Sequence, residues 1–398
     1  MREKKINVVF VTTHFNTTPN GPAVYANYIW NGFKNDPDIE FHIVAMGEQV
    51  NVPNIHMIKP PRNSYQVYRQ ICRKALEIIR KLPNPRILHV NNSHMGRILL
   101  NSSSIVIGQI NDYQNTDAIK DFFKNWRRAG IRRALSLVRR HFIEYEMVKK
   151  QNLTICNSKY TKKKIQESYH ALNSNKILVI YKAVDVDFFQ RQDMHSPLNS
   201  HSGQKESNIP KIVFVGTNFV RKGLDILLES LTLLNQRVIL YIIGTNRNFV
   251  EKRFGSHLLK KVENNGHVLV FLGNVLRDKL REILWKADIF VLPSRGEAFG
   301  VATLEAIASG LPALTSVKGG LKEIHDSLST PMGWRLSNLN AKNLTEKIDH
   351  ILNDLNYHKE IALYISNKKL KITFGVDRMI QEIRNIYIGQ MKKCMENT

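Results

Sequence analysis

Residues 297 to 312 read EAFGVATLEAIASGLP, and they place two carboxylates, Glu297 and Glu305, across the start of a predicted helix. A helix begins with unpaired backbone N–H groups and the positive end of its dipole, so this arrangement indicates a polar, anionic ligand. The helix follows a strand with the sequence ADIFVLPS, residues 287 to 294, and ends at Gly310. The sequence therefore predicts a ligand site at the carboxyl edge of a parallel sheet. The alternative is that both glutamates are solvated surface acids.

Length and composition predict two domains and no membrane span. The chain has 398 residues, of which 43% are hydrophobic, which is enough for two separate cores. It contains no run of about 18 apolar residues, the length that spans a bilayer. The segment MREKKINVVFVTT superficially resembles a signal peptide, but its apolar run is short and leads into polar residues, so we expect a first strand. The scattered Cys72, Cys156 and Cys394 fit a cytoplasmic protein without disulfides, and no residue cluster has metal-ligand spacing.

Short apolar strands alternate with helical stretches along the chain, which predicts βαβ units and parallel sheets. In the first part the predicted strands are 6–12, 39–45, 87–91, 104–110, 153–156 and 177–180. In the second part they are 211–216, 237–244, 267–273, 287–294 and 312–316. A polar stretch without apolar periodicity separates the two parts and predicts a linker at 191–209. We therefore expect α/β domains at 1–190 and 210–376, with the first completed by a helix at 377–398.

The chain is strongly basic. Its 58 lysines and arginines against 34 acids give a net charge of +24, which attracts polyanions, anionic membranes or phosphorylated substrates. Residues 117–150 hold 10 basic and 4 acidic residues, with Phe122, Trp126 and Phe142 among apolar residues at helical spacing. The pattern fits a basic amphipathic helix on an anionic membrane, or a helix whose apolar stripe is domain core. Nucleic-acid binding is a third possibility, and no recognised motif accompanies it.

A second loop carries two adjacent cations. The segment KIVFVGTNFVRKGLDILLESL, residues 211 to 231, places Arg221 and Lys222 between a strand ending at Gly216 and a helix. Arginine offers a planar fork of donors to phosphate oxygens, and lysine a compact point charge. Two cations at a helix start oppose the helix dipole, so they indicate an anionic partner. The alternative is a solvated basic turn.

These elements resemble, in order, the carboxyl domain of retaining GT-B glycosyltransferases of family 4, the glycosyl transferases group 1. The resemblance is carried by VGTNFVRKGLDILLESL, by FLGNVLRDKLREILWKADIFVLPSRGEAFGVATLEAIASGLPALTS, and by Gly319 and Gly320. It covers roughly residues 205 to 325, and the amino half matches more loosely through NNSH, NSKYTKKKI and YKAVDVDFF. It implies two Rossmann-like parallel-sheet domains facing across a cleft, with a nucleotide diphosphate sugar as the donor substrate.

The resemblance also implies a role for each matching residue. Arg221 and Lys222 neutralise the leaving diphosphate, and Glu297 accepts hydrogen bonds from hydroxyls of the donor sugar. Glu305 accepts hydrogen bonds from both ribose hydroxyls. The other donor-binding residues that it implies are Gly21 in the amino domain and Gly216, Gly273, Asn274, Phe299, Gly300 and Val301 in the carboxyl domain.

Three departures from the family pattern stand out. Gly21 is followed by Pro22 where relatives have a second glycine, which removes a backbone donor. Asp112 occupies the neighbourhood of a common histidine, and we assign it near the acceptor, the alternative being a strand-end turn. The NGVD pattern becomes KAVD, ending at Asp185, which forms a DxD pair with Asp187. That pair binds a metal in another glycosyltransferase architecture, but here it falls in a loop before the linker, so we expect no metal requirement.

The predicted activity is retaining transfer of a hexose from a nucleotide sugar, such as a UDP-sugar, to a glycan or lipid-linked acceptor in cell-surface polysaccharide assembly. Retention permits a double displacement or a front-face reaction, and the family resemblance favours the second. We expect no cofactor, no nucleic-acid partner, and a cytoplasmic protein that is peripheral on the inner face of the membrane through residues 117–150. The alternatives are a basic membrane- or RNA-binding module and a GT-B nucleotide-sugar epimerase or phosphorylase.

Overall fold

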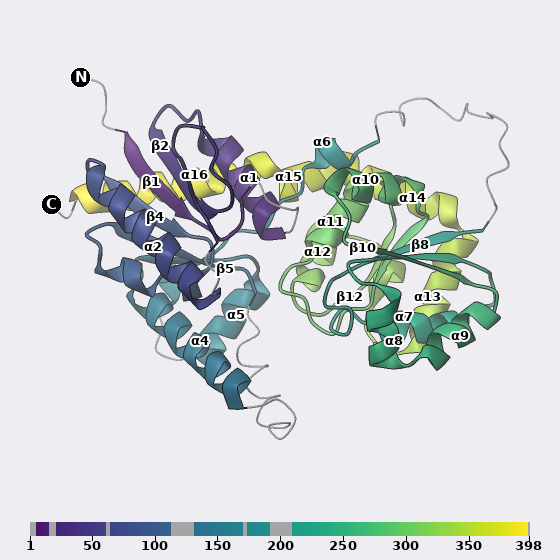
Figure 1. The fold of residues 1–398 in the computed structure, drawn as a ribbon. Coiled ribbons are helices and arrows are strands. Elements are labelled where there is room, and N and C mark those ends of the chain that lie inside the picture. The colour runs from purple at the N-terminus through teal and green to yellow at the C-terminus, as the bar shows by residue number, and fades with distance from the viewer. Residues whose placement is uncertain are drawn as a thin grey trace. The chain divides into compact units, whose positions relative to one another are not determined.

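The structure is a computed structural model that describes residues 5–15, 21–60, 64–112, 131–169, 173–191 and 209–396. The chain forms two compact units, Met1–Lys182 with Asp377–Thr398, and Ala183–Val376 (Figure 1). The division falls after Lys182, so residues 183–190, which the sequence assigns to the first domain, belong to the second unit. Most of the predicted linker, residues 192–208, lies outside the described residues.

The first unit is built on a sheet of seven parallel strands in the order β3-β2-β1-β4-β5-β6-β7. Every residue of the central strand β1 is buried, as expected for a Val- and Ile-rich strand covered by helices on both faces. The strands are β1 (Ile6–Val11), β2 (Ile39–Met46), β3 (Ile55–Ile58), β4 (Arg86–Val90), β5 (Ile105–Ile110), β6 (Leu153–Cys156) and β7 (Ile177–Val179).

Helices cover both faces of this sheet. On one face, α2 (Ser64–Lys81) and α4 (Ile131–Lys150) pack on a core that includes Val9 and Leu88. On the other face lie α1 (Gly21–Phe33) and α16 (Val376–Glu396), which returns from the second unit (Figure 1). The α16 residue Tyr387 is fully buried and its hydroxyl is hydrogen-bonded to His89 Nδ1 at 2.6 Å. The final helix is therefore part of the core of the first unit.

The second unit contains six parallel strands in the order β10-β9-β8-β11-β12-β13. They are β8 (Lys211–Val215), β9 (Ile239–Ile243), β10 (Val268–Gly273), β11 (Ile289–Leu292), β12 (Ala313–Ser316) and β13 (Arg335–Leu336). The helices of this unit that precede β12 are α6 (Val186–Phe189), α7 (Leu224–Leu231), α8 (Arg247–Phe254), α9 (Ser256–Asn264), α10 (Arg277–Lys286) and α11 (Val301–Ala308). Those that follow β12 are α12 (Gly320–Leu328), α13 (Ala341–Asn353), α14 (Leu355–Ile365), the π-helical turn η6 (Ser366–Leu370) and α15 (Lys371–Phe374). The described part of the first unit also contains α5 (Lys159–Ser168). Helix α7 packs against α9 and α13, and α11 packs against α14 and α6.

The predicted α/β fold with parallel sheets is confirmed, and each predicted strand has a counterpart. Two strands were not predicted, β3 and β13, which are 4 and 2 residues long. Segments this short carry too little hydrophobic periodicity to stand out from a loop.

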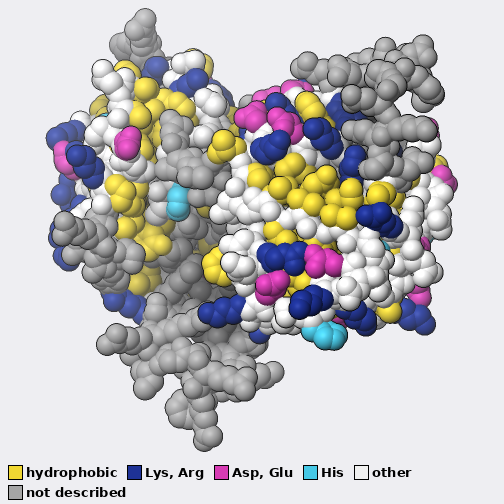
Figure 2. Space-filling view, turned by 45° about the vertical axis from the view of Figure 1, so that its right-hand side comes forward, with side chains coloured by type: hydrophobic (Ala, Val, Ile, Leu, Met, Phe, Trp, Pro, Cys, Tyr) yellow, Lys and Arg dark blue, Asp and Glu magenta, His cyan; other side chains and the backbone are white. Residues whose placement is uncertain are grey.

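Charged side chains are dispersed over the face of the described residues seen in Figure 2. Figure 2 shows lysines and arginines in separate groups, beside acids and beside a band of hydrophobic side chains, rather than merged into one patch on this face. Many exposed cations are paired, for example Lys322 with Asp326 at 2.6 Å. None of the helices in the described part of the chain combines the length and the hydropathy needed to cross a bilayer.

Candidate donor site in the second unit

The second sheet reverses its direction of winding between β8 and β11. From β8 the chain adds β9 and β10 on one side, and it then returns to add β11, β12 and β13 on the other. At such a switch point the loops that leave two adjacent strands diverge and open a crevice at the carboxyl edge. The loop after β8 carries Arg221 and Lys222, and the loop after β11 carries Glu297. The two sequence motifs therefore meet at the crevice of one sheet.

The loop that bears the two cations is fixed to the end of β11. The carbonyl oxygen of Arg221 accepts hydrogen bonds from the backbone N–H of Arg295 at 2.8 Å and from Ser294 Oγ at 3.3 Å. Gly223 has φ +79°, and a Cβ there would lie 2.0 Å from the carbonyl oxygen of Pro293. Only glycine permits this close approach in the left-handed region. The position of both cations thus depends on contact with the neighbouring strand.

Lys222 and Glu297 form an ion pair, in which Lys222 Nζ donates a hydrogen bond to Glu297 Oε2. The two side chains are only 14% and 10% exposed. A hydrogen-bonded charge pair shielded from water is stronger than a surface pair, and each member is costly to leave without the other. A ligand that engages either group must therefore offer a charge or a hydrogen bond in exchange.

The helix that begins after Glu297 presents its N-terminus without a side-chain cap. Gly300 is the N-cap residue of α11, with φ +114°, and it makes no side-chain hydrogen bond to the helix, which begins at Val301. The Phe299 ring is buried and packs edge-on against Phe374, with centroids 5.7 Å apart. The Phe299 ring therefore fixes the backbone at the start of α11, and the unpaired N–H groups of the first turn of the helix can still bind an anion.

Gly319 and Gly320 contact the backbone of Glu297. The N–H of Gly320 donates to the carbonyl oxygen of Glu297 at 2.9 Å. At Gly319, where φ is +65°, a Cβ would lie 2.1 Å from the same oxygen. The predicted glycine pair thus positions the acid through its main chain.

Three more glycines line the carboxyl edge at β8, β9 and β10. The N–H of Gly244 donates to Gly273 O at 2.7 Å, and a Cβ on Gly244 would meet the Gly216 backbone at 2.7 Å. Asn274, directly after Gly273, is exposed. The Lys222 side chain lies against Gly216, where a Cβ would meet its Cγ at 2.7 Å, whereas a Cβ on Gly273 would meet no atom within 4 Å.

Glu305 lies further along α11 and is partly buried. Burial raises the pKa of its carboxyl to about 7, because the charged form is poorly solvated there, and the positive charge of Arg277 acts in the opposite direction. Hydrogen-bond donors from a ligand would stabilise the ionised form.

Gly21 and Asp112 belong to the first unit. Gly21 is the exposed first residue of α1, and residues 16–20 before it lie outside the described residues. Asp112 is partly buried just after β5. Beside it, Asn111 Nδ2 donates to Asn91 O at 2.6 Å, and Asn157 Nδ2 donates to Asn111 O at 2.5 Å. This amide network joins the carboxyl ends of β4, β5 and β6, and no spacing in the sequence indicated it.

The two acids of the DxD pattern are each engaged with a cation. Asp185 lies 3.8 Å from Arg277 Nη1, and Asp187 accepts from Lys371 Nζ at 2.7 Å. Within the described ranges, no three His, Cys, Asp or Glu side chains are grouped so that they could hold a metal ion.

The basic segment 117–150 is described in part. Residues 117–130 lie outside the described residues, and α4 covers the rest. Met147 and Val148 of α4 are buried in the first unit, whereas Phe142 is 65% exposed. Met147 and Val148, which follow the predicted apolar stripe, are core residues, whereas Phe142 of the stripe faces solvent.

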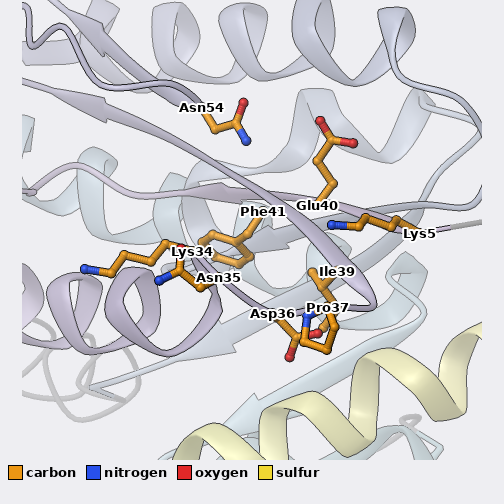
Figure 3. A pocket seen from close by; sticks show the side chains of 9 residues that line it. All are labelled: Lys5, Lys34, Asn35, Asp36, Pro37, Ile39, Glu40, Phe41 and Asn54. Carbon is orange, nitrogen blue, oxygen red and sulfur yellow. The ribbon is translucent and has the colours of Figure 1, made fainter.

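A depression of about 590 Å³ lies at the amino edge of the first sheet (Figure 3). Its lining is Lys5, Lys34, Asn35, Asp36, Pro37, Ile39, Glu40, Phe41 and Asn54. Asp36 is paired with Arg384 at 2.8 Å. Gly21 and Asp112 follow the carboxyl ends of strands, so this depression lies at the opposite edge of the sheet from them.

The two parallel sheets with their helices are those of a GT-B glycosyltransferase. The fold is similar to that of Anabaena HepE in complex with UDP and glucose, with a TM-score of 0.71 and 16% identity over 97% of this chain and 100% of that chain. Residues 197–368 match the family Glycosyl transferases group 1. Residues 197–368 therefore belong to this family of glycosyltransferases, as the resemblance in the sequence predicted.

Two relatives extend the comparison. An uncharacterised glycosyltransferase of Methanocaldococcus jannaschii is 24% identical over 388 residues, which are 92% of this chain and 96% of the relative. The O-antigen biosynthesis glycosyltransferase WclY of Escherichia coli is 27% identical over 237 residues, which are 57% of this chain and 60% of WclY.

Proposed function

We propose that the chain transfers a sugar from a nucleotide diphosphate sugar to a hydroxyl of a glycan or lipid-linked acceptor, with retention of configuration at the anomeric carbon. The observation that carries this proposal is the shielded pair of Lys222 and Glu297 at the switch point of the second sheet. The pair lies beside the uncapped start of α11. It offers a cation for a diphosphate and an acceptor for sugar hydroxyls.

In this proposal the two charges exchange partners when the donor binds. Lys222 turns to the diphosphate, where Arg221 adds a second cation, and together they stabilise the charge that develops on the leaving group. Glu297 then accepts hydrogen bonds from the sugar, and the N–H groups of residues 299–301 face phosphate and sugar. Because two cations can neutralise the leaving group, we expect activity without a divalent metal.

The nucleotide would lie along the glycine edge of the same sheet. Gly216 and Gly273 permit close approach of the base and phosphates, and the backbone of Asn274 contacts the base. Glu305 accepts hydrogen bonds from both ribose hydroxyls. A uridine nucleotide carrying a hexose is our first choice, supported by the UDP and glucose bound to HepE. In the first unit, Gly21 and Asp112 keep the roles that the family implies, phosphate approach and acceptor contact.

The acceptor is proposed to be a growing cell-surface polysaccharide at the inner face of the membrane. Two observations support this. WclY is a glycosyltransferase of O-antigen biosynthesis. Phe142 is 65% exposed on a helix rich in basic residues, a combination that favours adsorption to anionic lipid. A cytoplasmic location is consistent with Cys72 and Cys156, which are buried as free thiols.

A panel of UDP, GDP and ADP with their sugars, measured by thermal shift, tests the donor. We expect one series to raise the melting temperature, and Lys222→Met or Glu297→Gln to abolish the rise. The matched control is Lys279→Met, which removes an exposed lysine of the same unit that is also paired with a glutamate. Stabilisation by none of the nucleotides would overturn the proposal.

Turnover separates a transferase from its alternatives. A transferase releases nucleoside diphosphate only when a glycan or lipid acceptor is added, and ¹H NMR of the product then reports retention. Conversion of the sugar without an acceptor would instead identify an epimerase. Loss of turnover in EDTA, restored by Mg²⁺ or Mn²⁺, would contradict metal-independent transfer.

A further inference from the structure

The first sheet has a switch point of its own, between β1 and β4. From β1 the chain adds β2 and β3 on one side, and it then returns to add β4 and the strands that follow it on the other. The loops that leave β1 and β4 therefore diverge at the carboxyl edge, where open α/β sheets bind their ligands. The loop after β1 carries His14, and the loop after β4 carries Asn91. His14 has no role in the donor site described above.

The backbone of His14 is fixed on both sides. Thr12 is fully buried, its N–H donates to Val44 O at 3.0 Å, and its hydroxyl donates to His14 O at 3.4 Å. Phe15 is 1% exposed, and its ring packs edge-on against Trp30 with centroids 6.2 Å apart. His14 itself is only partly buried. Its side chain therefore stands on a rigid part of the loop.

The amide network at the carboxyl edge extends to this loop. Asn91 Nδ2 donates to Thr12 Oγ1 at 3.1 Å, and Asn111 Nδ2 donates to Asn91 Oδ1 at 3.0 Å. Hydrogen bonds thus connect the His14 loop to the ends of β4 and β5. The groups that make these connections are uncharged hydroxyls and amides.

The His14 imidazole is held by one of its two nitrogens. Nδ1 lies 2.7 Å from Thr13 Oγ1, and within the described part of the chain Nε2 makes no hydrogen bond. Burial lowers the pKa of His14 below its ordinary value of 6.5, so the ring is neutral at pH 7. A neutral imidazole whose Nδ1–H donates to a hydroxyl keeps Nε2 as a hydrogen-bond acceptor.

Resting on the proposed function, in which a hydroxyl is the acceptor, we propose that His14 is an acceptor-binding residue: Thr13 holds Nδ1, and Nε2 accepts a hydrogen bond from a hydroxyl of an uncharged sugar. A neutral ring beside a neutral amide network suits hydroxyl groups, which need hydrogen bonds and no counter-charge. A phosphate would instead require cations, such as Arg221 and Lys222 supply in the second unit.

NMR titration with the methyl glycosides of glucose, galactose and N-acetylglucosamine tests this without a donor. The His14 ring signals, assigned by their absence in His14→Gln, should move with at least one glycoside, and their ¹⁵N shifts should place the proton on Nδ1. His14→Leu should weaken binding of that glycoside about five- to tenfold, the effect of one hydrogen bond. His14→Gln, which keeps a polar group near the position of Nε2, should lose less.

Thr13 tests whether the ring is positioned by its neighbour. Thr13→Val keeps the shape of the side chain and removes the hydroxyl, so the ¹⁵N shifts of His14 should change and glycoside binding should weaken. Thr13→Ser should restore both.

His257→Leu is the matched control, because His257 is an exposed histidine of the second unit. It should leave glycoside binding unchanged. UDP affinity should stay within about twofold of wild type in all the His14, Thr13 and His257 variants, because the donor residues lie on the other unit.

Two results in the variants would overturn the inference. One is glycoside binding in His14→Leu equal to that of the wild type, and the other is a loss of UDP affinity in His14→Leu as large as the loss of glycoside affinity. A wild type that binds UDP but whose His14 signals move with none of the glycosides would overturn this inference and leave the donor site standing. A wild type that binds no nucleotide would overturn the proposed function, and this inference with it.

Discussion

Replacing Lys222 with methionine removes the partner of a carboxylate that is 10% exposed. A hydrogen bond to a charged group contributes about 1.5–3 kcal/mol, and the abandoned Glu297 carboxylate keeps its desolvation penalty. We expect Lys222→Met and Glu297→Gln each to lower the free energy of unfolding by about 1.5–3 kcal/mol. The double variant should lose less than the sum, by at least about 1 kcal/mol, because the second substitution removes the unpaired group left by the first.

Equilibrium urea unfolding, followed by circular dichroism and fluorescence, measures this coupling. The pair Lys279 and Glu282 in the same unit is the control, since it has the same residue types at 2.9 Å but side chains that are 59% and 48% exposed. Its double-mutant coupling should stay below about 0.5 kcal/mol. A Lys222–Glu297 coupling no larger than the control value would refute the argument that shielding makes this pair strong.

Burial lowers the pKa of the Lys182 amine below its ordinary value of 10.5, so the unfolded chain binds a proton there more tightly than the folded chain does. This difference destabilises the folded state at pH 7, and the destabilisation decreases as the pH rises toward 10.5. Lys182→Met should therefore raise the urea midpoint at pH 7 and raise it less at higher pH; a variant less stable than wild type at pH 7 would count against this. Gly319→Ala should abolish UDP binding and lower the melting temperature, because its Cβ would lie 2.1 Å from a backbone oxygen. Gly255→Ala, with φ +89° and open space around it, should cost about 1–3 kcal/mol of backbone strain and leave UDP binding intact; loss of UDP binding in this variant would contradict the role of close contact. Tyr387→Phe removes a buried hydroxyl 2.6 Å from His89 and should cost about 1–3 kcal/mol in urea unfolding with no change in UDP affinity; weakened UDP binding would contradict it.

The strands were predictable where they are long and apolar. All six residues of β1 are buried, and a nearly continuous apolar run such as INVVFV is expected in a strand that is covered on both faces of a parallel sheet. The short β13, with two residues, depends instead on pairing with β12 through Thr315 and Arg335. Pairing between distant segments leaves no periodic trace in the sequence.

The division of the chain also depended on contacts. Residues 183–190 continue the predicted first domain in sequence, but Phe189 is buried against α10, where Trp285 donates to its carbonyl oxygen. This contact joins positions 96 residues apart. Polarity and composition therefore indicated a linker nearby without indicating where the packing changes.

Within the candidate site, residue type was predictable and partnership was not. Arg221, Lys222, Glu297 and Glu305 were identified because their side chains suit phosphate and hydroxyl groups and because they follow strands. Nothing in the spacing of these residues indicated that Lys222 and Glu297 pair with each other. The pair forms because the chain brings residues that are 75 positions apart in the sequence to neighbouring loops.

The sequence by itself determined the α/β class, the family of glycosyltransferase and the loops that carry charge, because hydrophobic runs, glycines and cations act over a few residues. Only the tertiary structure decided that Lys222 and Glu297, 75 residues apart, neutralise each other at the start of α11. The physical reason is that charge interactions depend on distance and solvent shielding, and both are set by which strands are neighbours in the sheet.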